Sequence, residues 1–248
     1  MRFWVCSILL VCVLVLLVLL ALHSEILRDL GPVPPKDPTQ SWWRQTHKPY
    51  SLARFQMAFW FFLVIASFLF IWQITGASEI ITGSVLGLIG IGAGTALGAA
   101  AIDAGKSAGN NSQLSSLKAE LVTLQHEMTA LDTQLTAAPP PSNKVELEHQ
   151  KTAKQTRLNL ITDQMTALST AVGPKASDGF LNDILTDDAN GISFHRFQVF
   201  IWTLVLGILF VYSVWNRLSM PEFSATLLAL MGSSSGTYLG FKIPEKQT

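Results

Sequence analysis

Charge is scarce in this sequence: only 14% of its 248 residues are Asp, Glu, Lys or Arg, against about 25% in a typical soluble domain. Acidic and basic side chains are equal in number, so no net charge is present to attract nucleic acid. The two cysteines, Cys6 and Cys12, lie in one apolar run and exclude a disulfide or thiolate metal framework. The five histidines are isolated, and no side chains form a nucleophile–base pattern. We therefore expect no enzyme activity, no cofactor, no metal ion and no nucleic-acid partner.

Hydrophobic residues, 49% of the chain, are gathered in long blocks, which is typical of a membrane protein. The first block runs uninterrupted over residues 3–22, long enough to cross a bilayer of about 30 Å at about 1.5 Å per residue. A cleaved signal peptide is the alternative; the length of the block and its single flanking Arg2 favour a retained anchor. Four further spans are predicted at residues 55–74, 80–102, 197–215 and 223–241.

The distribution of basic residues predicts the orientation of these spans. Lys and Arg are retained on the cytoplasmic side of a membrane. With the N-terminus outside, 15 of the 17 basic residues lie inside, and only Arg2 and Arg217 lie outside. We predict an N-terminus outside and a C-terminus in the cytoplasm.

The second and third predicted spans together form a repeat with the fourth and fifth. Residues 54–98 match residues 196–240 without a gap, and 12 of the 45 positions are identical. The identical pairs are Arg54 and Arg196, Phe55 and Phe197, Gln56 and Gln198, Trp60 and Trp202, Phe68 and Phe210, Leu86 and Leu228, Leu88 and Leu230, Gly90 and Gly232, Gly94 and Gly236, Thr95 and Thr237, Leu97 and Leu239, and Gly98 and Gly240. Both copies start on the same side of the membrane, so we predict two parallel copies of a helical hairpin.

Glycines recur at every fourth position in the second helix of each hairpin. They are Gly90, Gly94 and Gly98 in the first copy and Gly232, Gly236 and Gly240 in the second. Such residues form one smooth stripe on a helix, along which another backbone can approach closely. We predict a tight helix–helix seam, within the chain or between subunits; ordinary membrane packing without an assembly role is the alternative.

Hydroxyl groups cluster near the middle of the last predicted span. Ser233, Ser234 and Ser235 replace residues 91–93 of the first copy, and Thr237 follows. Hydroxyls at this depth either bond across helices and to carbonyls one turn earlier or line a water path. Packing and pore lining both remain open. No charge lies deep in any predicted span, which argues against an ion-coupled transporter.

The insert between the two hairpins has a different periodicity. Its apolar residues alternate at steps of three and four, as Leu114, Leu117, Leu121, Leu124, Met128, Leu131 and Leu135, and again as Leu158, Ile161, Met165, Leu168 and Val172. Three prolines at 139–141 separate the two runs. This pattern predicts an antiparallel coiled-coil hairpin. Folding at the prolines would bring Glu127 and Asp132 near Lys154 and Lys151.

Four segments of the second hairpin carry a resemblance. They are residues 192–198 (ISFHRFQ), 202–207 (WTLVLG), 220–223 (MPEF) and 236–241 (GTYLGF). In these segments the chain is similar to a family of uncharacterised bacterial inner-membrane proteins; the similarity covers the second hairpin well and the first loosely. It implies a location in the bacterial inner membrane and no particular activity or site.

Together these patterns predict an all-α integral membrane protein with five transmembrane helices and a cytoplasmic coiled-coil hairpin. The predicted parts are an anchor (1–22), a Pro- and Trp-containing cytoplasmic connector (23–54), transmembrane hairpin repeat 1 (55–102), a cytoplasmic insert (103–195), transmembrane hairpin repeat 2 (196–241) and a cytoplasmic tail (242–248). Within the insert, residues 180–185 are predicted to form a short amphipathic helix. The leading functional hypothesis is a homo-oligomeric membrane assembly, with a pore or channel as its possible activity. The alternative is a scaffold or sensor that recruits a cytoplasmic protein through the coiled coil.

Overall fold

The computed structural model describes residues 15, 19, 24–35, 47–137, 142–187 and 191–245. The chain divides into two compact units, one formed by residues 1–103 and 174–246 and the other chiefly by residues 104–173. The predicted anchor at 1–22 lies outside the described residues, apart from Val15 and Leu19. The same holds for the proline link at 139–141 and the last residues of the tail.

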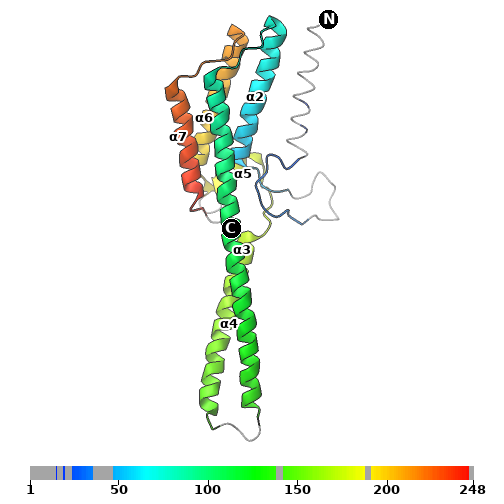
Figure 1. Ribbon diagram of the computed structural model, residues 1–248, viewed down its shortest axis with the longest axis vertical. Coiled ribbons are helices and arrows are strands. Elements are labelled where there is room, and N and C mark those ends of the chain that lie inside the picture. The colour runs from blue at the N-terminus through cyan, green and yellow to red at the C-terminus, as the bar shows by residue number, and fades with distance from the viewer. Residues whose placement is uncertain are drawn as a thin grey trace. The chain divides into compact units, whose positions relative to one another are not determined.

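The first unit is built from long helices, shown side by side in Figure 1. They are α2 (Leu52–Thr75), the beginning of α3 (Gly83–Leu135), α6 (Phe194–Arg217) and α7 (Ala225–Lys242). Of the helices in the described residues, α2, α3 and α6 are long and apolar enough to cross a membrane. A helix satisfies its backbone hydrogen bonds internally, which is what a lipid environment requires. The structure therefore confirms three of the five predicted membrane-length segments; α7 forms a helix at the fifth but is not among them.

Each of these four helices contributes a large side chain to one apolar core. Trp60 of α2, Leu88 of α3, Phe210 of α6 and Met231 of α7 are all at most 1% exposed and belong to the same cluster. Helix α6 contacts both α2 and α7. Within a bilayer, association of helices depends on such close packing, because lipid tails are as apolar as the side chains.

The connections within the two hairpins bind to one another. Helix α2 ends at Gly76, whose φ of 72° reverses the chain at a conformation that glycine adopts without strain. Ser84, in the first turn of α3, accepts a hydrogen bond from the backbone N–H of Phe223 at 3.0 Å. Thr82 donates to the carbonyl of Pro221 at 2.9 Å. These bonds hold the start of α3 beside the start of α7.

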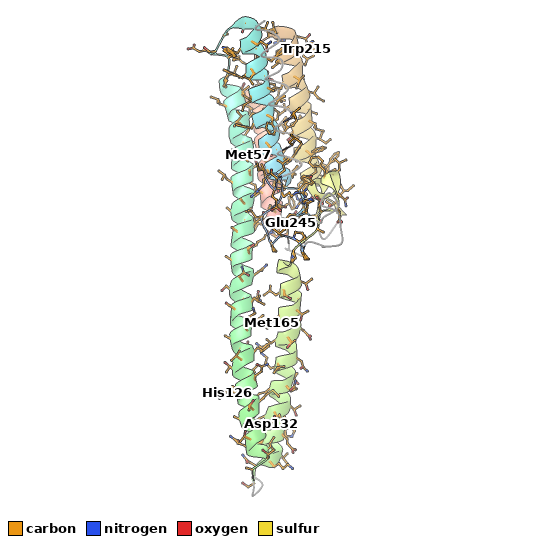
Figure 2. The ribbon with its side chains drawn as sticks, turned by 90° about the vertical axis from the view of Figure 1, so that its right-hand side faces the viewer. Met57, His126, Asp132, Met165, Trp215 and Glu245 are labelled. Carbon is orange, nitrogen blue, oxygen red and sulfur yellow. The ribbon has the colours of Figure 1, made fainter. Side chains whose placement is uncertain are left out.

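The second unit pairs the remainder of α3 with α4 (Lys144–Val172). Leu117, Leu124 and Ile161 form a buried cluster between them, and Met165, labelled in Figure 2, packs against it. The ion pairs between the helices are Glu120 with Arg157, Glu127 with Lys154 and Asp132 with Lys151, at 2.7, 2.6 and 2.5 Å. Residue numbers rise on α3 as they fall on α4, so the helices run antiparallel. The two ion pairs predicted from the sequence are formed.

A small element precedes α6 in the first unit. Helix α5 (Phe180–Leu185) forms at the predicted residues and buries Ile184. Strands β1 (Thr186–Asp187) and β2 (Gly191–Ile192) pair antiparallel after it. The carboxylate of Asp183 accepts a hydrogen bond from the backbone N–H of Tyr50 at 3.0 Å, which fixes α5 next to the start of α2.

Candidate functional site

The glycines of α3 and α7 divide into two groups, and the first lies in a seam between these helices. A Cβ atom built on Gly98 would lie 2.8 Å from Cδ1 of Leu239, and one built on Gly232 would lie 4.0 Å from Cδ1 of Ile91. A side chain at position 98 would therefore force Leu239 to shift, so the absence of one favours the close approach of α3 and α7 here. Here the predicted seam is within the chain.

The second group of glycines faces away from the rest of the chain. Gly90 and Gly94 on α3, and Gly236 and Gly240 on α7, are exposed, and a Cβ atom on any of them would meet no other atom within 4 Å. On α3 this open surface is flanked by Leu97, which is 72% exposed. These four glycines therefore have no packing role inside the described part of the chain.

Two of the four hydroxyl residues singled out in the sequence point into the bundle. Ser234 and Ser235 are 1% and 4% exposed. Gln198 donates from Nε2 to Oγ of Ser234 at 3.0 Å, and Gln56 donates from Nε2 to Oγ of Ser235 at 3.5 Å. The hydroxyl of Ser234 also donates to the carbonyl of Leu230 at 2.9 Å. The amide of Gln56 is buried and that of Gln198 is partly buried, so each needs such a partner, and both serines have a packing role in this structure.

The other two hydroxyl residues lie on the outer side of α7. Ser233 and Thr237 are exposed, and their hydroxyls donate to the carbonyls of Leu230 and Ser233 at 3.0 and 2.9 Å. They share this side with Gly236 and Gly240. The four candidate pore-lining residues are thus not brought together on one surface of the chain.

Sequence reasoning missed the two glutamines as site residues, although the repeat contained the signal. Gln56 and Gln198 occupy equivalent positions in the two copies, each following an Arg-Phe pair. Both reach serines of α7, whereas the positions on α3 that correspond to Ser234 and Ser235 are Gly92 and Ala93, which carry no hydroxyl.

A second polar cluster, also missed, gathers where α7 ends. Lys242 and Asp103 form an ion pair at 3.0 Å, with side chains only 6% and 13% exposed. Arg196 and Glu245 form another at 2.9 Å. The ring of Tyr238, 1% exposed, lies between the two cations, with its centroid 5.9 Å from both the Arg196 guanidinium carbon and Lys242 Nζ. Ion pairs and cation–π contacts in this setting join the end of α7 to α3 and α6.

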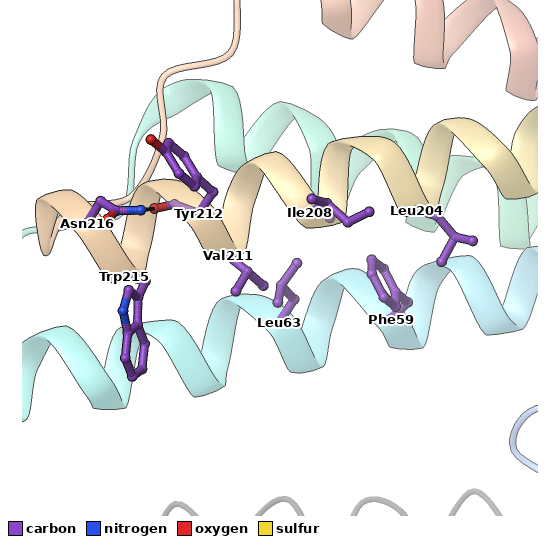
Figure 3. A pocket seen from close by; sticks show the side chains of 9 residues that line it. Phe59, Leu63, Leu204, Ile208, Val211, Tyr212, Trp215 and Asn216 are labelled. Atoms are coloured by element: carbon purple, nitrogen blue, oxygen red, sulfur yellow. Dashed lines mark hydrogen bonds between the residues drawn. The ribbon is translucent and has the colours of Figure 1, made fainter.

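An apolar groove of about 550 Å³ runs along α2 and α6. Phe59 and Leu63 of α2 face α6, and Trp215 extends from α6 toward α2 (Figure 3). Gly207 leaves space for Phe59, because a Cβ atom at position 207 would lie 2.6 Å from Cζ of Phe59. The lining is almost entirely apolar and presents no converging polar groups, so the groove is suited to lipid chains rather than to a polar substrate.

In the described part of the chain, no three His, Cys, Asp or Glu side chains lie close enough to hold a metal ion. Searches against protein-family models, curated proteins and solved structures find no match. The resemblance to bacterial inner-membrane proteins accordingly stays a prediction.

Proposed function

We propose that this protein is a homo-oligomeric assembly of the bacterial inner membrane, without enzymatic chemistry, whose subunits meet through the outer sides of α3 and α7. The observation that carries the proposal is the second group of glycines. Gly90, Gly94, Gly236 and Gly240 are exposed, and a Cβ atom built on any of them would meet no atom of another element of the described chain within 4 Å. Small residues at such spacing let helix backbones of two subunits approach closely.

The parallel repeat is part of this proposal. Contacts between α3 and α7 occur at Gly87 with Leu228, and at Gly98 with Leu239. Both pairs have the same sequence separation, which supports two helices that run in the same direction at matching heights. Five spans, including 1–22 and α7, and a coiled-coil arrangement of the insert complete the architecture that we propose. The connector and insert hold 12 of the 17 basic residues, whereas only Arg217 lies between the fourth and fifth predicted spans; this distribution supports a cytoplasmic location for the connector and insert.

A pore is the activity that this assembly would support best. Ser233 and Thr237 lie on the same outer side of α7 as Gly236 and Gly240. If α7 helices surround a central axis, these two hydroxyls would face it and provide polar groups in an otherwise apolar channel. Ser234 and Ser235 would instead hold the bundle together through the two glutamines.

Leucine substitutions test the assembly. We expect Gly94→Leu and Gly236→Leu to shift the purified protein in nanodiscs from oligomer to monomer, because the added side chain keeps the neighbouring backbone away. Gly105→Leu is the matched control, since Gly105 is also a helical glycine of α3 with no atom within 4 Å of a built Cβ but lies in the second unit. Unchanged oligomers in both membrane variants would refute the proposed contact.

The second candidate function is a scaffold or sensor that recruits a cytoplasmic protein through the α3–α4 hairpin. The observation in its favour is the exposed apolar side chains Val122, Val145 and Leu160 on these helices, at 63%, 69% and 47% exposure. Deletion of residues 114–172 separates the two functions. If the deletion releases a bound cytoplasmic protein and leaves the oligomer intact, the result favours the scaffold. If the protein conducts ions and Ser233→Leu abolishes this leakage, the result favours the pore.

A further inference from the structure

Two polar atoms in the core of the first unit have no hydrogen-bond partner, although both are buried. Among the described residues, these side-chain atoms are Oε1 of Gln56 and Nε1 of Trp60. The two residues are 0% and 1% exposed. A buried polar group without a partner is costly, and native structures usually satisfy it with protein or with ordered water.

The two atoms belong to one side of one helix. Gln56 and Trp60 are four residues apart on the buried face of α2, so their side chains are neighbours one turn apart. The Nε1 edge of Trp60 faces α3, because its Cδ1 atom lies 3.4 Å from the position that a Cβ of Gly92 would occupy. The amide of Gln56 reaches Ser235 of α7. The site therefore lies where α2, α3 and α7 meet.

We propose that this place binds one water molecule, which accepts a hydrogen bond from Nε1 of Trp60 and donates one to Oε1 of Gln56. Water is the chemical match because the site presents a donor and an acceptor, and a water molecule supplies the complement of both. Water also fits if the oxygen and nitrogen of the Gln56 amide are exchanged, since one water molecule can accept hydrogen bonds from two N–H donors. A cation does not fit, because the indole N–H would point its positive end at the ion.

The repeat explains why the site occurs once. In the second copy, Gln198 bonds Ser234 directly at 3.0 Å. In the first copy the corresponding position on α3 is Gly92, which supplies no hydroxyl and lies next to the indole edge of Trp60. The water then takes the part that a serine hydroxyl takes in the second copy. This inference concerns the interior of one chain and is independent of the proposed assembly.

A double-substitution cycle tests the water. Trp60→Phe removes the N–H but keeps an aromatic ring, and Gln56→Leu removes the amide. We expect each variant to lower the folding equilibrium constant of the full chain in micelles about tenfold, and the pair together to lower it little more than one alone, because both act on one bridge. Trp202→Phe, at the equivalent position of the second copy, is the control and should combine additively with Gln56→Leu. The proposal would be overturned if the single variants leave the folding equilibrium constant unchanged or raise it, and if their effects on the folding free energy add in the double variant.

A direct measurement covers the case in which the variants do not fold. In the unsubstituted protein labelled with ¹⁵N-tryptophan, the indole N–H of Trp60 should show a nuclear Overhauser effect to a long-lived water. An indole signal without any contact to water would overturn the proposal, as would a shift of that signal that depends on the concentration of Na⁺ or K⁺.

Discussion

Replacement of Gly98 by alanine should disturb the seam between α3 and α7, whereas the same replacement at Gly94, one turn away, should not. The two substitutions share their effect on the helix, since alanine is favoured over glycine by about 1 kcal/mol in a helix interior. The difference between the variants therefore isolates the contact that a methyl group makes at each place. Comparison within one helix also keeps the depth in the membrane nearly constant.

The magnitude follows from the distances at the two positions. A Cβ atom on Gly98 would lie 2.8 Å from Cδ1 and 3.3 Å from Cδ2 of Leu239, whereas one on Gly94 would meet nothing within 4 Å. Overpacking of this kind typically costs about 1–3 kcal/mol. Because the end of a leucine side chain can rotate away, we expect the lower half of that range. Gly98→Ala should thus be less stable than Gly94→Ala by about 1–2 kcal/mol.

The assay is the free energy of unfolding of the dissociated chain, measured by steric trapping in dilute micelles so that subunit contacts do not contribute. When both variants also carry Leu239→Ala, the difference in stability between Gly98→Ala and Gly94→Ala should disappear. Leu239→Ala removes the two methyl groups with which the new Cβ at position 98 collides. Equal stability of Gly98→Ala and Gly94→Ala would refute the account of the seam.

Three further predictions concern burial and charge. Ile161→Ala should destabilise the α3–α4 pairing by about 2–5 kcal/mol, because Ile161 is 0% exposed; loss of amide protection in α4 would report it. Asp103→Asn should destabilise the first unit by about 3–5 kcal/mol, since it breaks the buried ion pair with Lys242, and the double variant with Lys242→Gln should recover part of this loss in thermal unfolding. The hydrogen bond from Lys48 lowers the pKa of Glu25 below its ordinary value of 4.5. This pair therefore stabilises the fold above pH 4.5 and loses its effect as the pH falls through the lowered pKa. Hydrogen exchange at residues 24–35 should show this pH dependence, and Glu25→Gln should remove the pH dependence.

The features that sequence reasoning predicted well are those set by periodicity along one element. The heptad spacing of the insert predicted which faces of α3 and α4 meet, and a fold at the prolines then placed Asp132 opposite Lys151. Helix α5 was predicted at its observed residues. Such patterns work because side chains three and four residues apart share one face of a helix.

The features that it could not predict depend on how helices are rotated relative to each other. The three consecutive serines of α7 look alike in the sequence, yet Ser234 points into the bundle and Ser233 points out. The direction is set by Gln198, which lies 36 residues away in sequence. The ion pair of Asp103 with Lys242 was missed for the same reason, because the two residues were assigned separately to the ends of two spans.

The mass of the purified protein in lipid nanodiscs is the measurement that tests the proposed assembly most directly. We predict a single species whose mass is an integer multiple of 27.1 kDa and larger than one chain. Symmetric particles of uniform size would agree with subunits that meet through the open glycines of α3 and α7. A monomer at every protein concentration would contradict the assembly and leave the scaffold as the remaining function.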